Sequence, residues 1–313
     1  MMTIGDTTEE LAVVEKSGHA IAFHDVSDGS LLGRVELGAY PHEMVIDAGR
    51  KYAYVAHYGV RMSGDAGAGG TRVFVVDLAA RRLERTIELS PFNRLHGIAI
   101  DDHDRLYVLS EEKAILLRID DPATAGAPSG AVATGGIKTH MVVINRAGTR
   151  AYVTGLLSGT VSAVDPHDAS APPLVAAPGP LPESCALSRD EKQLYVGVRG
   201  AKSLVRLDAE TMREEKRVAV KGDPLRVYVV PGDRALLTTD IENRTVTRYD
   251  TDLREVDALQ FDAIPAGISF HRSEPIAFVT LLDRNQVAIV DLETLATLRT
   301  IATGSEPDVT ALI

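Results

Sequence analysis

Short apolar runs alternate with polar turns along the whole chain, and these runs recur with a common opening phrase. The phrase is clearest in "PHEMVID", "LHGIAID" and "THMVVIN", and further copies follow as "PESCALS", "PLRVYVV", "PAGISFH" and "PDVTALI". The copies begin at residues 41, 95, 139, 182, 224, 265 and 307, so successive starts are 54, 44, 43, 42, 41 and 42 residues apart. A period of about 40–45 residues is typical of one blade of a β-propeller.

Each full repeat contains four short runs with the composition of β-strands. After the opening run come a polar turn such as "DDHDR", a second run such as "AYVTG", a third that ends in Asp such as "RVFVVD", and a fourth such as "LATLRTIAT". Alternating or apolar runs that are broken by Gly, Asp and Asn turns predict strands. The repeats therefore predict blades of four antiparallel strands.

The two ends of the chain complement each other. Residues 10–37 contain three strand-like runs before the first full repeat, whereas the phrase at 307 supplies one run. Pairing these segments closes the ring and removes the unpaired edges of an open sheet. We therefore predict an all-β fold in a single domain, 1–313. It is a seven-bladed β-propeller of four-stranded antiparallel blades, and its last blade is closed by the N- and C-terminal strands.

Two families share parts of this pattern. "AYVTGLLSGTVSAVD" at 151–165 resembles the YVTN-type β-propeller repeat, with Gly155 where that family usually has Asn. The resemblance implies the propeller fold over essentially the whole chain, but members include binding proteins, surface proteins and lactonase relatives. "LHGIAID" is also similar to the Pro-His-Gly-Ile phrase of streptogramin lyases, which are seven-bladed propellers. The chain lacks Trp, so the Trp-Phe strand of those lyases is missing, and we do not transfer their catalytic residues.

The composition of the chain limits the kinds of molecule that it is expected to bind and the compartment in which it is expected to work. The net charge is −11 and the basic residues are scattered, which argues against nucleic acid and anionic membrane surfaces as partners. Cys185 is the single cysteine, so no intrachain disulfide or cysteine-rich zinc site can form. The N-terminal residues lack a basic, then apolar, signal pattern, and nowhere do about 18 apolar residues run together. We expect a soluble, cytoplasmic protein, and a monomer because a closed ring leaves few edges to pair.

One position of the repeat carries several residues that could bind a metal or act in catalysis. In a propeller the first strand of each blade lines the central channel, so the residues that follow the phrase openers form a ring. They are His42, His96, His140, Glu183, Leu225, Ala266 and Asp308. Imidazole and carboxylate ligands suit Fe, Zn, Mn, Ni or Cu, whereas Ca prefers oxygen ligands throughout. We predict a divalent transition metal held by His42, His96, His140 and Glu183. Whether Asp308 or Glu43 joins the site stays open, and histidines retained from an ancestral repeat are the alternative.

Other residues near this ring are candidates for catalysis. His57 ends the second strand of the first repeat, beside the start of the strand that carries His42, and could transfer a proton. Arg199 and Arg226 could hold a substrate carboxylate or phosphate. Glu111, Asp240 and Asp283 rank lower. The Gly-rich segment 59–71 lies at the same end, where it would act as a lid or be a disordered insertion.

Two classes of function follow from this pattern. The first is a metal-dependent enzyme that acts on a small polar molecule at the channel mouth, as a lyase, isomerase or hydrolase. An oxygen-using enzyme would employ the same ligands. The second is a non-catalytic scaffold that binds a protein or a small ligand. A protein-binding scaffold would need exposed aromatic anchors, and aromatic residues are only 5% of the chain.

Overall fold

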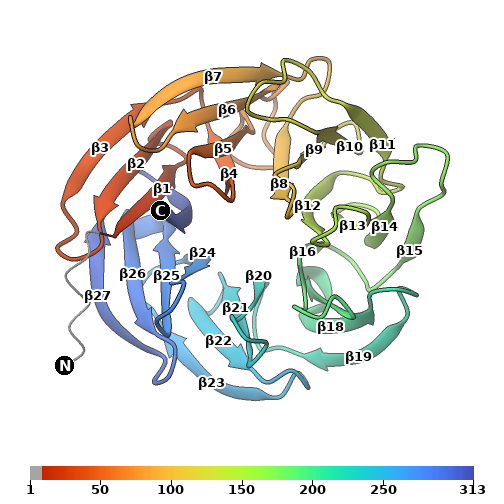
Figure 1. Ribbon diagram of the computed structural model, residues 1–313. Helices are drawn as coiled ribbons and strands as arrows, with labels where there is room; N and C mark the ends of the chain where they lie inside the picture. Colours follow the sequence, from red (N-terminus) through yellow and green to blue (C-terminus); the bar gives the residue numbers. More distant parts are fainter. Residues whose placement is uncertain (1–8) are drawn as a thin grey trace.

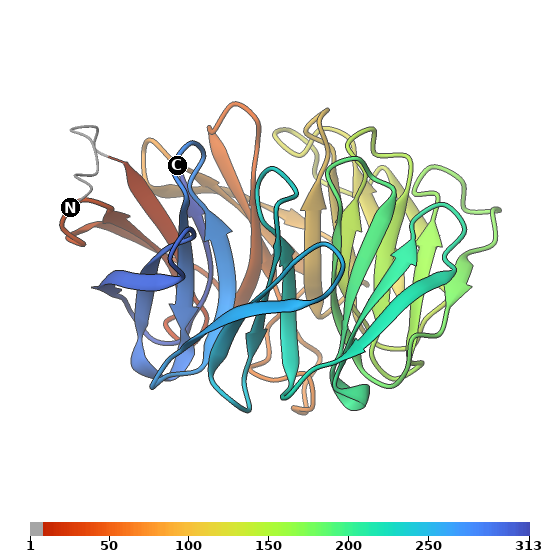
Figure 2. The same cartoon turned by 90° about the horizontal axis from the view of Figure 1, so that it is seen from below.

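The protein forms a ring of seven four-stranded antiparallel sheets around a central axis (Figure 1). The computed structural model describes residues 9–313. Figure 2 shows the ring edge-on, with connecting loops at its two ends. This arrangement confirms the predicted seven-bladed β-propeller.

The blades follow one another along the chain, and each inner strand begins at one of the repeated phrases. The first blade contains β4 (Pro41–Ile46), β5 (Tyr52–His57), β6 (Arg72–Asp77) and β7 (Arg82–Glu88). The second contains β8 (Leu95–Ile100), β9 (Leu106–Ser110), β10 (Ile115–Ile119) and β11 (Gly130–Ala133). The third contains β12 (Thr139–Ile144), β13 (Ala151–Gly155), β14 (Thr160–Val164) and β15 (Leu174–Ala176).

The remaining blades repeat the same order. The fourth contains β16 (Pro182–Leu187), β17 (Gln193–Val198), β18 (Ser203–Asp208) and β19 (Glu214–Ala219). The fifth contains β20 (Pro224–Val229), β21 (Leu236–Asp240), β22 (Thr245–Tyr249) and β23 (Glu255–Gln260). The sixth contains β24 (Pro265–Phe270), β25 (Ile276–Leu281), β26 (Gln286–Asp291) and β27 (Ala296–Ala302). Two 3₁₀ turns, η1 (Arg199–Ala201) and η2 (Leu282–Arg284), follow β17 and β25. Within residues 9–313, no helix has the length and apolar character needed to cross a bilayer.

The seventh blade joins the two ends of the chain. Its inner strand is β28 (Pro307–Leu312), which pairs with β1 (Glu10–Glu15), followed by β2 (Ala20–Asp25) and β3 (Leu31–Glu36). Leu11 lies opposite Leu312, and Glu15 lies opposite Pro307. Figure 1 shows the C-terminal end of the chain against β1. The predicted closure by both ends is therefore confirmed.

The hydrophobic core lies between neighbouring blades. Val73, Val75 and Ile87 of the first blade pack with Leu95 and Val108 of the second, and all of these side chains are buried. The outermost strands alternate between exposed and half-buried residues, as in β19 and β23, because one face of each meets solvent. Burial of each Val, Leu or Ile side chain contributes about 1.5–3 kcal/mol, so contacts between blades dominate the stability of the ring.

Every inner strand carries a β-bulge at the ring position. In β4, for example, His42 and Glu43 together lie opposite a single residue of β5. Corresponding register shifts occur in β8, β12, β16, β20, β24 and β28. A bulge breaks the alternation of side chains along a strand and re-aims them. Two successive residues of one inner strand can therefore face the channel.

Candidate active site

A cavity of about 570 Å³ opens at the end of the ring where the inner strands begin. The ring positions form its floor, and they bring together every predicted metal ligand. The polar residues on its wall include Lys16, His42, His96, His140, Glu183, Arg199, Arg226 and Asp308. Its apolar residues include Leu156, Leu157, Leu181, Leu225, Ile241, Ile264, Ala266 and Leu282. Charged and apolar side chains thus both line the cavity, and the third, fourth and fifth blades contribute some of each.

A second ring lies beside the first and was not recognised in the sequence. It consists of the residue that directly follows the second strand of each blade: Lys16, Tyr58, Glu111, Leu156, Arg199, Ile241 and Leu282. All of these except Glu111 line the cavity. The period that reveals the histidines reveals this second ring as well, once the ends of the second strands are aligned in the same way.

The three ring histidines pack side by side with their rings tilted against one another. The ring centroids of His42 and His96 are 4.1 Å apart, and those of His96 and His140 are 3.6 Å apart. The ring of Tyr58 meets both His42 and His96 edge-on. All three histidines are buried. The three imidazoles are thus in contact, but each has different polar neighbours.

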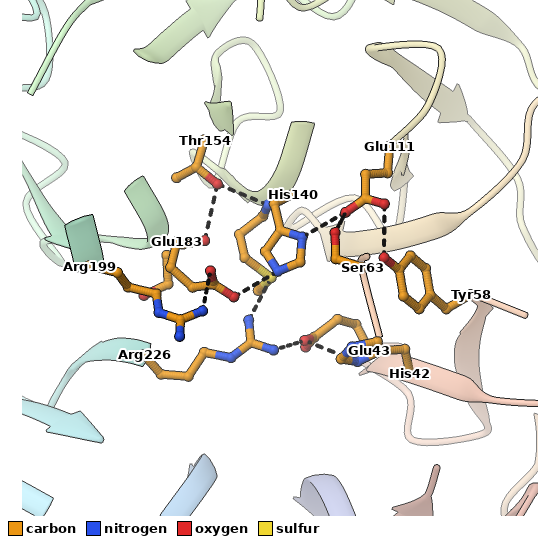
Figure 3. A network of polar contacts seen from close by, with 12 residues as sticks. His42, Glu43, Tyr58, Ser63, Glu111, His140, Thr154, Glu183, Arg199 and Arg226 are labelled. Carbon is orange, nitrogen blue, oxygen red and sulfur yellow. Dashed lines mark hydrogen bonds and ion pairs between the residues drawn. The ribbon is translucent and has the colours of Figure 1, made fainter. Parts of the chain in front are cut away.

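His140 lies between two carboxylates (Figure 3). Its Nδ1 is 3.0 Å from Glu111 Oε1, and its Nε2 is 2.8 Å from Glu183 Oε1. Ionised carboxylates only accept hydrogen bonds, so both ring nitrogens donate and the ring is an imidazolium. Burial alone would lower the pKa of His140, but Glu183 and Glu111 outweigh burial and raise that pKa above its usual value. His140 is therefore a fixed positive charge in this cavity.

Glu111 is the residue on which this arrangement depends. It is fully buried and accepts hydrogen bonds from the Tyr58 hydroxyl at 2.8 Å and from Ser63 Oγ at 2.9 Å. Burial opposes its ionisation, but the bond to His140 and the two hydroxyl donors lower its pKa. Sequence reasoning ranked Glu111 low, and the second ring explains why it lies beside His140.

Arg199 and Arg226 both reach the cavity and bind carboxylates of the chain itself. Arg226 donates to Glu43, and both side chains are buried. Arg199 forms two 2.6 Å bonds with the carboxylate of Asp223 and a 3.2 Å bond with Glu183. Figure 3 shows the guanidinium group of Arg199 beside Glu183 and that of Arg226 beside Glu43. The two arginines thus position the acidic residues of the floor.

His57 lies apart from the cavity in the part of the chain that the structure describes. Pro41 pairs with His57 across β4 and β5, as the sequence suggested. The imidazole, however, packs against Phe74 with ring centroids 5.0 Å apart and does not line the cavity, whereas Tyr58 does. Burial lowers the pKa of His57. Tyr58, the next residue, lines the cavity where we expected His57, because successive side chains point to opposite sides of a strand.

His42, Glu43 and His96 form the group that could hold a metal ion. One ligand atom of each lies within 4.8 Å of the other two. His96 Nδ1 is a buried atom without a hydrogen-bond partner among residues 9–313. His42 Nδ1 also lies 2.6 Å from Asp308 Oδ2 and 3.6 Å from Glu43 Oε1. The group therefore differs from the predicted set, because Glu43 joins it while His140 and Glu183 bind each other.

The protonation of these imidazoles suits metal binding. Burial, together with the neighbouring charge of His140, lowers the pKa of His96 well below its usual value. Burial also lowers the pKa of His42, against the opposing effect of Asp308. Both rings are neutral near pH 7, which is the form that binds metals. Lys16 Nζ lies 3.0 Å from His42 Nε2 and Asp308 Oδ2 lies 2.6 Å from His42 Nδ1, so a metal on His42 would replace one of these two contacts.

The segment 59–71 lies over one side of the cavity. Arg61, Met62 and Ser63 line it, and Arg61 forms an ion pair with Glu306, which precedes β28 in the neighbouring blade. The buried guanidinium of Arg94 donates to the backbone oxygens of Ser63 at 3.0 Å, Asp65 at 2.5 Å and Gly67 at 3.0 Å. The segment is thus anchored over the cavity and differs from a disordered insertion, and its action as a lid stays a prediction.

Comparisons with known proteins establish the fold alone. No family model matches the chain, and no curated protein matches it. One chain in a crystal structure of the mitotic checkpoint complex is similar, with a TM-score of 0.73 and 12% identity over 87% of this chain and 81% of that chain. A functionally unknown protein from Desulfotomaculum acetoxidans DSM 771 is similar, with a TM-score of 0.78 and 10% identity over 97% of this chain and 98% of that one.

Proposed function

We propose that the protein is a metal-dependent enzyme that acts on a small molecule in the cavity at the channel mouth. In this proposal a divalent transition metal binds His42, His96 and Glu43, with Asp308 beside it. Two imidazoles and one carboxylate leave open positions for substrate on Fe(II), and Zn, Mn, Ni and Cu accept the same donor atoms. His140 and Glu183, which we first expected to be ligands, instead set the charge beside the metal.

The observation that carries this proposal is the buried group of His42, Glu43 and His96, in which one ligand atom of each residue lies within 4.8 Å of the other two. His96 Nδ1 is buried without a hydrogen-bond partner among residues 9–313. A buried polar atom that lacks a partner loses about 1–3 kcal/mol of solvation free energy. A cation bound to the three residues would supply that partner.

The cavity supports chemistry at a carbonyl group. A bound metal can polarise a carbonyl oxygen or activate water. The His140 imidazolium and the guanidinium groups of Arg199 and Arg226 stabilise negative charge that develops nearby. We therefore propose a lyase, isomerase or hydrolase reaction that begins with polarisation of a substrate carbonyl. The same donor atoms would also serve an oxygen-using enzyme.

The family relation, the cellular location and the oligomeric state of the protein are also part of the proposal. The YVTN-like repeat at 151–165 supports a relation to that propeller family, whose members include lactonase relatives. Cys185 is buried, and burial raises the pKa of its thiol to about 12, so this cysteine is unreactive and compatible with a reducing compartment. We propose that the enzyme works in the cytoplasm as a monomer on a small-molecule substrate.

The first experiment measures metal content and binding. The purified protein is stripped with a chelator, offered Zn²⁺, Mn²⁺ or anaerobic Fe²⁺, and analysed by mass spectrometry of the elements. We expect about one metal per chain for the native protein and for His103→Ala, which changes an exposed histidine. His96→Ala and Glu43→Gln should lose the metal while their circular dichroism is unchanged. Failure of the native chain to bind any transition metal would overturn the proposal and favour the scaffold.

The second experiment tests catalysis. Metal-loaded and stripped protein are compared on small esters, lactones and hydroxy acids, which all carry a carbonyl group. Turnover should require the metal and should be lost in His96→Ala. Turnover that persists in the stripped protein would assign the histidines to metal-free acid–base chemistry.

A further inference from the structure

The apolar side of the cavity continues outward into a groove. Leu156, Leu157 and Leu181 line both the main cavity and a second hollow of about 380 Å³, which Ala177, Gly179 and Pro180 also line. Leu157 is 67% exposed and Leu181 is 41% exposed. Exposed leucines grouped at the mouth of a cavity are typical of a surface that binds an apolar group.

The backbone holds these leucines in place. Leu156 N donates to Lys138 O at 3.1 Å, and Leu157 N donates to Ile137 O at 3.2 Å. Ile137 is itself 62% exposed on the same rim. The loop after β13 and the segment before β12 therefore form one fixed apolar edge, and Lys138 connects it to the polar floor.

Lys138 differs from the other cations of the cavity. The other Lys and Arg side chains on the wall each have a carboxylate partner: Lys16 with Asp308, Arg61 with Glu306, Arg199 with Asp223, and Arg226 with Glu43. Lys138 Nζ donates to the backbone oxygen of Ser63 at 2.5 Å, and no carboxylate of residues 9–313 lies within 4.0 Å of it. An ammonium group has three donors. Two of these N–H donors, and a positive charge that has no carboxylate partner, are thus available to a ligand.

We propose that Lys138 and the groove over Leu157 and Leu181 form a binding subsite for an amphipathic anion. The carboxylate of the ligand binds the Lys138 ammonium, and its acyl or aryl chain lies against the two leucines. The continuity of the groove with the cavity carries this assignment, since one ligand can reach both. The inference deepens the proposed function by naming its substrate class, and its reactive role rests on that function.

Octanoate is the probe that tests the subsite. Calorimetric titration of the full chain compares octanoate with butyrate and with octanol, first with a chelator present and then after metal loading. Each buried methylene contributes roughly fourfold in affinity, so butyrate should bind at least about tenfold more weakly than octanoate. Leu157→Ser combined with Leu181→Ser should weaken octanoate by about tenfold or more. Leu298→Ser, an exposed leucine on β27, is the matched control and should change nothing.

A second variant tests the charge. Lys138→Gln should weaken octanoate about tenfold and leave octanol unchanged, because octanol carries no charge. The inference would be overturned if octanoate bound equally to the native chain, to Leu157→Ser combined with Leu181→Ser, and to Lys138→Gln. A dimer in size-exclusion chromatography that Leu157→Ser abolishes, without octanoate binding to the native chain, would identify the groove as an interface between two copies and also overturn it.

The two proposals fail separately. Octanoate binding that depends on Lys138 and the leucines, in a protein that binds no metal, would keep the subsite and remove the metal-dependent function. Metal binding through His96 in a protein that does not bind octanoate would keep the function and remove the subsite.

Discussion

Arg226 of β20 and Glu43 of β4 form a buried ion pair between the fifth and first blades, which are not neighbours in the ring. Each of the two residues directly follows a ring position, and the bulges of β20 and β4 direct both side chains to the channel. Burial opposes the charge of Arg226, but Glu43 raises its pKa. The pair connects opposite sides of the site and holds one proposed metal ligand.

Removal of one partner of this pair should destabilise the protein strongly. Glu43→Ala leaves the Arg226 guanidinium buried without a carboxylate, and loss of one partner of a buried pair costs about 3–5 kcal/mol. Glu43→Leu together with Arg226→Met should recover most of that free energy of unfolding, because no buried charge remains. Urea denaturation measures both. Glu88→Ala is the control, since its partner Arg72 is exposed and the expected change is below about 1 kcal/mol. A double variant as unstable as Glu43→Ala would contradict the prediction.

The metal-free protein should lose stability as the pH rises above 6.5. The folded state raises the pKa of His140 above the value of 6.5 for the free side chain, so it binds this proton more tightly than the unfolded chain does. The stabilisation is fully present below pH 6.5 and disappears as the pH rises through the pKa of folded His140. The pKa values of His42 and His96 are lowered, so these residues act on stability below pH 6.5 and leave the upper range to His140.

Urea unfolding between pH 6 and 9 checks this dependence. The difference in free energy between the native chain and His140→Gln should shrink as the pH increases. A difference that stays constant across this range would show that His140 is not held as an imidazolium.

The segment 59–71 should become more mobile when Arg94 loses the guanidinium group that donates to three backbone oxygens. Arg94→Lys keeps a positive charge near Glu111 but cannot bind three backbone oxygens in the same geometry. Limited trypsin digestion should cut after Arg61 several-fold faster, as read by mass spectrometry of the fragments. Arg82→Lys changes an exposed residue and serves as the control. Equal cutting rates would mean that other contacts hold the segment.

Metal removal should lower the melting temperature of the native protein. A ligand at 100 times its dissociation constant stabilises the folded state by about 2.7 kcal/mol. Calorimetry with and without a chelator should therefore show a shift in the native chain and in His103→Ala, and none in His96→Ala. A shift of the same size in His96→Ala would place the metal elsewhere.

The repeat made the fold and the first ring predictable. Apolar runs of period two define strands, and a shared phrase sets their register, so His42, His96 and His140 could be assigned to one height without any structure. The same rule misplaced His57 and underrated Glu111. His57 points away because it alternates with Tyr58, the residue that follows β5, and Glu111 lies beyond the last residue of β9.

The partners of Glu43 depend on features that a repeat does not encode. Strict alternation would place His42 and Glu43 on opposite faces of β4, and the bulge overrides it. The pairing with Arg226 depends further on the distance between two inner strands that are not adjacent, which follows from the packing of all seven blades. A local pattern carries no information about either.

The closure of the ring has a consequence for biosynthesis. A ribosome makes β1 early and β28 about 300 residues later, so β1 lacks its partner while the intervening blades emerge and fold in order. Asp308 lies on β28 and next to His42. The contact between Asp308 and His42 therefore forms only when the ring closes, and an incomplete translation product lacks it.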